Sequence, residues 1–248
     1  MRSKIHFHKV AAILGVKFRA IANGNMAVMP IFIIVLAVVL RFAFKSMGGG
    51  EVNSFVSGYI LNFGLTFNIG SMGIFLTSAI LAEEKEKNTL RVLMTSSVNG
   101  AEFFIGSILP IFTVMMAVNV LVLLVSGIPM ETVNLWMFLG ITAVASLTAC
   151  IFGMLLGIVT NNQVAASTLS TPFLLLVTLI PAFSSLIPEL KKVCVFLFTG
   201  VVAEMAESYA AGQGYQLSLL SGIVLAATAV LASALFLLAY KDNGYEKE

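Results

Sequence analysis

The sequence has few charged residues. Only 10% of its 248 residues are Asp, Glu, Lys or Arg, whereas 59% are hydrophobic, and the mean hydropathy is +1.01. A soluble domain carries about 25% charged residues, because its surface must be covered with polar groups. The deficit excludes an ordinary cytosolic enzyme, a nucleic-acid-binding domain and a disordered chain. A net charge of +2 is also too small to indicate a polyanionic partner. We therefore expect a membrane protein that does not bind nucleic acid.

The sequence also lacks the motifs of metal, nucleotide and protease sites. Cys150 and Cys194 form no CxxC pair, and the only histidines, His6 and His8, precede the first apolar run. A metalloprotease needs a pattern such as H-E-x-x-H, and a serine protease would need a histidine within the membrane. No G-x-x-x-x-G-K-[ST] occurs, and the triple glycine at 48–50 has no lysine after it. We therefore expect no catalytic residue, no metal ligand and no bound cofactor in this chain, and no cleavable signal peptide of the usual form.

Long apolar runs dominate what is present. A helix needs roughly 20 apolar residues to cross a hydrocarbon core of about 30 Å. The uncharged stretch between Glu131 and Glu189 is too long for one crossing, and the polar triplet at 161–163 divides it into two. These runs are continuous and do not alternate every second residue, which excludes a strand barrel. Six spans are expected in residues 26–240: Met26–Phe44, Phe55–Ala82, Phe103–Gly127, Val133–Val159, Val164–Ile187 and Leu217–Tyr240.

The basic residues predict which way the spans run. With six spans both termini lie on one side, and that side would hold ten of the fourteen Lys and Arg residues. The other side would hold four: Arg41, Lys45, Lys191 and Lys192. Because positive residues stay in the cytoplasm, we expect both termini, including the tail 241–248, to be cytoplasmic. Arg41 and Lys45 follow the first span closely enough to reach the outer interface.

The first 25 residues read as an amphipathic helix. One stripe of the predicted helix carries Phe7, Val10, Leu14, Phe18 and Ile21. Lys9 and Arg19 lie off that stripe, and Lys17 lies beside it. A helix of this kind lies in the membrane surface with its cations near anionic headgroups, and a span follows directly here. The alternative is a helix packed against a soluble partner.

The densest group of charges follows the second span. Six of the 26 charged residues fall between Glu83 and Arg91, and an apolar cluster with Leu90 and Leu93 comes next. Asn99-Gly100 then makes a turn before the third span. A short amphipathic helix between two membrane helices suits docking into a groove on a soluble protein. A solvated loop whose charges only set topology explains the composition equally well.

A resemblance to a known family favours the docking element. ABC type-2 permeases carry a pattern close to E-K-E-x-G-T-L-x-x-L-x-x-[ST]-P-[VI]-x-x-x-E-x-x-x-G-K after their second helix. This sequence is similar at Glu84, Lys85, Glu86, Thr89, Leu90, Leu93, Ser96, Val98, Glu102 and Gly106. It departs from the pattern with Asn88 for glycine, Ser97 for proline and Ser107 for lysine. The layout of the rest of the chain also resembles this family.

The resemblance implies an architecture and a set of partners. The fold is an all-α polytopic membrane protein, in which an N-terminal interfacial (elbow) helix precedes six spans, as in ABC type-2 (type V) exporters. The loop 83–100 would couple the chain to a separate cytosolic ATPase that holds ATP and Mg. The outer segment 188–216 would contain short helices, one of them near Ala203–Ala211. We expect two ATPase subunits and a second permease copy or a related permease, in a plasma membrane of bacterial type. The residues expected to couple to the ATPase are Glu83, Glu84, Lys85, Glu86, Lys87, Thr89, Leu90, Arg91 and Leu93.

Polar residues within the spans are amides and hydroxyls. Asn68, Ser71 and Ser78 fall on one face at spacings of three and seven. Such groups either bond neighbouring helices together or face a translocation path. In the family the second and fifth spans line the path between two subunits. The candidates for that path are Asn62, Thr66, Asn68, Ser71, Ser78, Thr168, Thr171 and Thr178.

The resemblance therefore implies an ABC permease subunit, and the uncharged polar and apolar spans favour export of an amphipathic peptide, a drug or another hydrophobic molecule. The alternative is an ion-coupled carrier or a channel. A carrier usually places an ionisable residue near the midplane, and a channel needs a recognisable filter. The spans show neither feature.

Overall fold

The computed structural model describes residues 13–19, 27–47, 53–89 and 100–242, and in these ranges the chain is helical without strands. Six helices are long and apolar enough to cross a membrane, as the sequence predicted. They are α2 (Val28–Met47), the continuous helix Ser54–Glu86, α6 (Gly100–Ser126), α7 (Leu135–Val159), α8 (Gln163–Ser184) and α11 (Leu219–Asp242). Their ends differ from the predicted spans by a few residues, chiefly because the second helix continues into the charged cluster.

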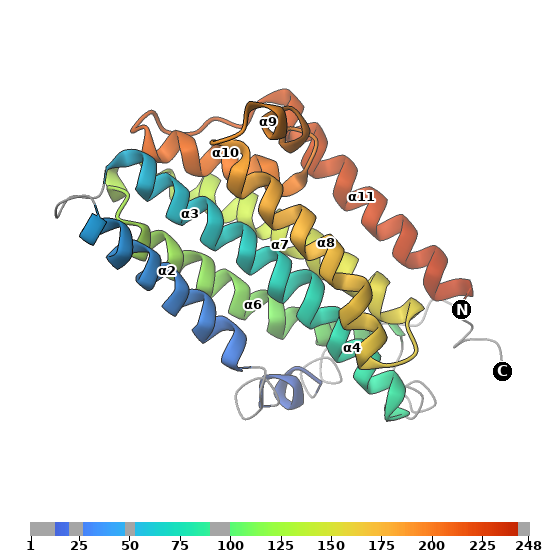
Figure 1. Ribbon diagram of the computed structural model, residues 1–248. Coiled ribbons are helices and arrows are strands. Elements are labelled where there is room, and N and C mark those ends of the chain that lie inside the picture. Colours follow the sequence, from blue (N-terminus) through green and yellow to red (C-terminus); the bar gives the residue numbers. More distant parts are fainter. Residues whose placement is uncertain (1–12, 20–26, 48–52, 90–99, 243–248) are drawn as a thin grey trace.

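The helix Ser54–Glu86 is the centre of the bundle. It consists of α3 (Ser54–Asn68), the π-helical segment η2 (Ile69–Leu76) and α4 (Thr77–Glu86). In its most apolar stretch 78% of the residues are buried, against 17% in α2 and in α11. The two outer helices therefore expose valine, leucine and phenylalanine to the surroundings, as lipid-facing helices do. Figure 1 shows α2 and α11 at opposite edges of the bundle, with α3 and α8 between them.

Asparagine begins three of these helices. The side chain of Asn53 accepts a hydrogen bond from the Val56 amide at 2.9 Å, and Asn134 and Asn162 do the same at the starts of α7 and α8. Each satisfies one of the amide groups that a helix start leaves without an internal partner. Asn162 also ends the turn after Thr160, so the predicted division of the long uncharged run is confirmed.

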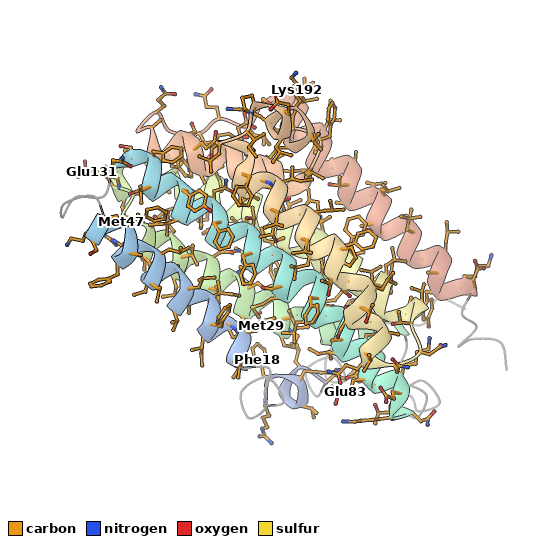
Figure 2. The ribbon with its side chains drawn as sticks, viewed as in Figure 1. Phe18, Met29, Met47, Glu83, Glu131 and Lys192 are labelled. Atoms are coloured by element: carbon orange, nitrogen blue, oxygen red, sulfur yellow. The ribbon has the colours of Figure 1, made fainter. Side chains whose placement is uncertain are left out.

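Short helices cover one end of the bundle. After α8 the chain forms α9 (Pro188–Cys194) and α10 (Phe198–Ala210), and the 3₁₀ turn η3 (Met130–Thr132) lies between α6 and α7. The predicted helix near Ala203–Ala211 is confirmed as part of α10. Helix α10 packs against α3, and the hydroxyl of Tyr209 donates to the carbonyl of Asn134 at 3.1 Å. Figure 2 shows Glu131 and Met47 at this end and Glu83 at the opposite end.

Arg41 lies near the end of α2 but does not extend into the surroundings. Its guanidinium donates to the carbonyl of Val125 at 2.7 Å. That carbonyl belongs to the last turn of α6, where a cation is favourable because the final carbonyls have no helical donor. The charge therefore joins α2 to α6.

Two glycines let α7 approach the central helix closely. A Cβ atom on Gly153 would lie 2.4 Å from the carbonyl oxygen of Gly73 and 2.7 Å from Cβ of Thr77. A Cβ on Gly157 would lie 2.8 Å from the carbonyl oxygen of Ser78. Helices in a membrane gain little from the hydrophobic effect, so they depend on contacts of this kind.

Replacing Gly153 with alanine is expected to lower stability by about 1–3 kcal/mol, because the added methyl group pushes α7 away from a backbone that cannot yield. Thermal unfolding of the purified protein in detergent measures the effect. The matched control is Gly140→Ala on the same helix, since a Cβ there meets no atom within 4 Å. Equal stability of the two variants would contradict the close-packing account.

Candidate coupling surface and polar span faces

The predicted coupling charges lie at the last turn of α4. Glu83 to Glu86 are helical, and Lys87 ends the helix. Thus the first part of the predicted loop continues the membrane helix rigidly. Figure 2 shows Glu83 at the lower end of the bundle, with Phe18 of the segment 13–19 in the same region. Leu90, Arg91 and Leu93 fall outside the described residues.

Two of these charges hold the turn between α7 and α8. The ammonium of Lys85 donates to the carbonyls of Ile158 at 2.8 Å and Thr160 at 2.9 Å. The Gln163 amide donates to a carboxylate oxygen of Glu86 at 3.1 Å. A cation therefore meets the carbonyl end of α7, and an anion meets the amide end of α8, as the two helix dipoles require. Both side chains join the end of α4 to the neighbouring helices.

Glu84 joins α4 to the segment 13–19. Its carboxylate forms an ion pair with Lys17, and the side chains of both residues are less than one-fifth exposed. The Lys17 ammonium also lies 5.4 Å from the ring centre of Phe103, within range of a cation–π contact. Burial lowers the pKa of Lys17 to about 8, while the charge of Glu83 acts in the opposite direction. The ammonium is thus placed in a costly environment, which it tolerates because carboxylates surround it.

The exposed part of this region lies just beyond the helix. Lys87 donates to Glu83 at 2.5 Å, one turn back, and this hydrogen bond raises the pKa of Lys87. The hydroxyl of Thr89 donates to the carbonyl of Glu84 at 3.0 Å. Asn88 has a φ of +57°, the left-handed region that asparagine tolerates better than other residues with a Cβ. The glycine that the resembling pattern carries at this position suits the same backbone shape.

We name the group Glu83, Glu84, Lys85, Glu86, Lys87, Asn88 and Thr89 the coupling end of α4. Three of its charged residues, Glu84, Lys85 and Glu86, bind other parts of the chain. The exposed residues of the group are Glu86, Lys87, Asn88 and Thr89. The turn at residues 161–163 is also exposed beside it. The two segments together present a polar surface that Lys85 and Glu86 hold in a fixed relation.

The structure brings the two predicted polar spans together. Ser78 of α4 lies 2.5 Å from the hydroxyl of Ser170 of α8. Thr178 donates to the carbonyl of Thr66 at 3.3 Å, and the amide nitrogen of Asn62 donates to the carbonyl of Pro181 at 2.9 Å. The four side chains that make these bonds, Ser78, Ser170, Thr178 and Asn62, are all buried. Within the protomer these groups bond the central helix to α8 along its length.

The expectation that Asn68, Ser71 and Ser78 share one face is wrong. Asn68 donates to the carbonyl of Met115 at 3.0 Å and to Oδ1 of Asn119 at 2.8 Å, both on α6, whereas Ser78 contacts α8. The hydroxyl of Ser71 donates to the carbonyl of Phe67 in its own helix. The cause is η2, because a π-helix forms i→i+5 bonds and rotates the following residues away from α-helical spacing.

The remaining path candidates differ in exposure. Thr66 is buried and donates to the carbonyl of Asn62 at 2.8 Å. Thr168 and Thr171 are exposed on α8, where each hydroxyl donates to the carbonyl four residues earlier. Of the eight candidates, these two lie on the outer surface of the protomer. Leu175, one turn after Thr171, is exposed on the same side of α8.

Sequence reasoning missed three participants in these sites. The partner of Glu84 is Lys17, whose position beside the apolar stripe was the only signal of its burial. The backbone of Thr160 and Gln163 carries no sequence signal as a partner of Lys85 and Glu86.

Among the described residues no group of His, Cys, Asp and Glu has the arrangement of a metal site. Cys150 and Cys194 are buried free thiols.

Comparison with known families identifies the chain. Residues 16–199 match the family described as ABC-2 type transporter. The match covers both the segment with Lys17 and the coupling end of α4, and it extends through α8 and α9 to the start of α10. A search of curated proteins finds no match.

The ion pair between Lys17 and Glu84 is expected to contribute an interaction energy on the order of 1 to 3 kcal/mol, since its removal leaves a charge largely buried. A double-mutant cycle with Lys17→Met and Glu84→Gln, followed by thermal unfolding, measures it. Reversing both charges with Lys17→Glu and Glu84→Lys should recover part of the loss. Additive single losses would show that the two side chains act independently.

Proposed function

The chain belongs to the ABC-2 type transporter family and is a membrane subunit of an ABC transporter; we propose that it is the permease of an exporter driven by a separate cytosolic ATPase. The ATPase subunits, of which we propose two, hold ATP and Mg. A second copy of this chain, or a related permease, completes the translocation path. The cargo is an amphipathic peptide, a drug or another hydrophobic molecule.

One observation carries this proposal. The coupling end of α4 is bonded to three other elements: to the segment 13–19 through Glu84, and to α7 and α8 through Lys85 and Glu86. A displacement of this end by an ATPase therefore moves four elements together. A solvated loop that only sets topology would not need these bonds. The arrangement favours a rigid connection among these four elements over a flexible one.

The central helix links the coupling end of α4 to the opposite end of the bundle. Its first half packs against α10, and its last half carries the coupling end. The π-helical segment lies between the two halves, and π-helical turns occur frequently at functional sites. We infer that a change at the coupling end reaches α10 through this one helix. The exposed hydroxyls of Thr168 and Thr171 lie on the outer surface of α8, where the second permease copy would complete the path.

The ATPase partner can be tested directly. The affinity-tagged chain should capture a cytosolic ATPase from its native membrane and stimulate its hydrolysis in proteoliposomes. Replacing Lys85 with methionine should keep the ATPase bound but reduce that stimulation at least about fivefold, because α4 is released from α7. Lys192→Met, at the other end of the bundle, is the matched control. Capture of no ATPase would overturn the proposal. Unchanged stimulation in Lys85→Met would contradict the claim that a rigid connection between α4 and α7 transmits the change.

The orientation has its own test. Cytoplasmic termini place the coupling end inside the cell and α9 outside. A cysteine at Lys87 should react with an impermeant maleimide only in inverted membranes, and a cysteine at Lys192 only in intact cells. Both positions are exposed, whereas Cys150 and Cys194 are buried and give little background. The opposite labelling pattern would reverse the topology.

A further inference from the structure

A cavity of about 330 Å³ lies where α3, α8, α9 and α10 meet, far from the coupling end. Its size is at the lower limit of small-molecule sites, which span about 300–1,000 Å³. Gly58 forms part of one wall. A Cβ atom added to Gly58 would lie 2.8 Å from Cβ of Ala210, so α3 and α10 approach each other closely there. Figure 1 shows α9 and α10 above the end of α8 in this region.

The inner wall carries a hydrogen-bond acceptor without a donor. Asn62 lines the cavity and is 2% exposed. Its amide nitrogen donates to the carbonyl of Pro181, which fixes the amide so that Oδ1 is the free acceptor. Oδ1 has no hydrogen-bond partner in the described part of the chain. A buried acceptor of this kind favours any ligand that brings an O–H or N–H group.

The charges of the cavity balance each other. Lys191 and Glu207 line it, and the Lys191 ammonium lies 3.6 Å from a carboxylate oxygen of Glu207. Tyr59 is the remaining titratable residue of the lining, and its ring stacks on Phe63 at a centroid distance of 6.1 Å. A neutral ligand leaves this partly exposed pair intact, whereas a charged ligand would compete for one of its two members.

We propose that this cavity binds the neutral, hydroxyl-bearing polar group of an amphipathic molecule. A ligand hydroxyl donates to Oδ1 of Asn62, and the ring of Tyr59 packs against the apolar part of the same group. This inference rests on the proposed transport function, for which it specifies the chemical class of the cargo. It gives Asn62 a role in ligand binding at one end of the bundle, in addition to its hydrogen bond to Pro181 of α8.

Octyl β-glucoside, used below its micelle concentration, is the probe. The tagged protein in lipid nanodiscs is titrated with the tritiated glucoside in a scintillation proximity assay, and the signal of empty nanodiscs is subtracted. Binding should be saturable. Unlabelled octanoate and octylammonium, which carry the same chain length with a charge, should displace it at concentrations at least about tenfold higher than unlabelled glucoside does.

Two variants test the site itself. Asn62→Leu should weaken glucoside binding at least about tenfold. Ala211→Trp should do the same by filling the cavity mouth from an exposed position, which guards against misfolding of the first variant. Gln213→Trp, exposed on the same connection but not part of the lining, should bind as the parent chain does.

Three results would overturn the site: no saturable binding, equal displacement by the three amphiphiles, or unchanged binding in both Asn62→Leu and Ala211→Trp. The assay contains no ATPase. Failure of the cavity therefore leaves the capture and stimulation of an ATPase unaffected, and failure of the ATPase experiments leaves the binding result to stand as a ligand site of this membrane subunit.

Discussion

The contact between α7 and the central helix determines how the rest of the bundle is arranged. Gly153 and Gly157 bring the backbone of α7 against the carbonyls of Gly73, Ile74 and Ser78. The nearest atoms there are backbone carbonyls together with Cβ of Thr77 and Leu81, so a small shift in either helix is resisted by atoms that cannot move aside. The other spans pack around this pair: α6 and α8 bond to the central helix through amides and hydroxyls, and α11 lies on α7. The bundle is thus built outward from one close helix pair.

Electrostatics at one end of the bundle depends on that pair. Because α7 is held so near to α4, its last carbonyls come within reach of Lys85, and the start of α8 comes within reach of Glu86. The charges that look from the sequence like a freely solvated docking motif are therefore partly used inside the protein. Because these charges are bonded to neighbouring helices, a displacement of this end of α4 would move those helices with it. Close packing in the membrane and charge pairing at its surface act on the same helices.

Much of the fold could be predicted because bilayer thickness and helical rise leave few alternatives. Six apolar runs of sufficient length and the polar interruption at residues 161–163 follow from composition, whereas the short helix near Ala203–Ala211 is implied by the family resemblance. The shared face of Asn68 and Ser78 could not be predicted correctly, because no simple sequence pattern announces the π-helical segment between them. The pairing of Lys17 with Glu84 joins residues far apart in the chain, and the free acceptor of Asn62 depends on where Pro181 places its carbonyl. Such contacts depend on how distant segments are arranged in three dimensions, which the periodicity of the sequence does not reveal.

The π-helical segment has a consequence for the length of the central helix. A stretch with i→i+5 bonds contains more residues per turn than an α-helix, so Ile69–Leu76 holds surplus chain between two halves whose ends are fixed elsewhere. Loss of one residue here would let the helix continue as an ordinary α-helix, with α3 still against α10 and α4 still against the 161–163 turn. The same loss within α3 or α4 would rotate Asn62 or Lys85 away from its partner. A one-residue deletion is therefore expected to be tolerated better in Ile69–Leu76 than in α3 or α4, although this segment is buried.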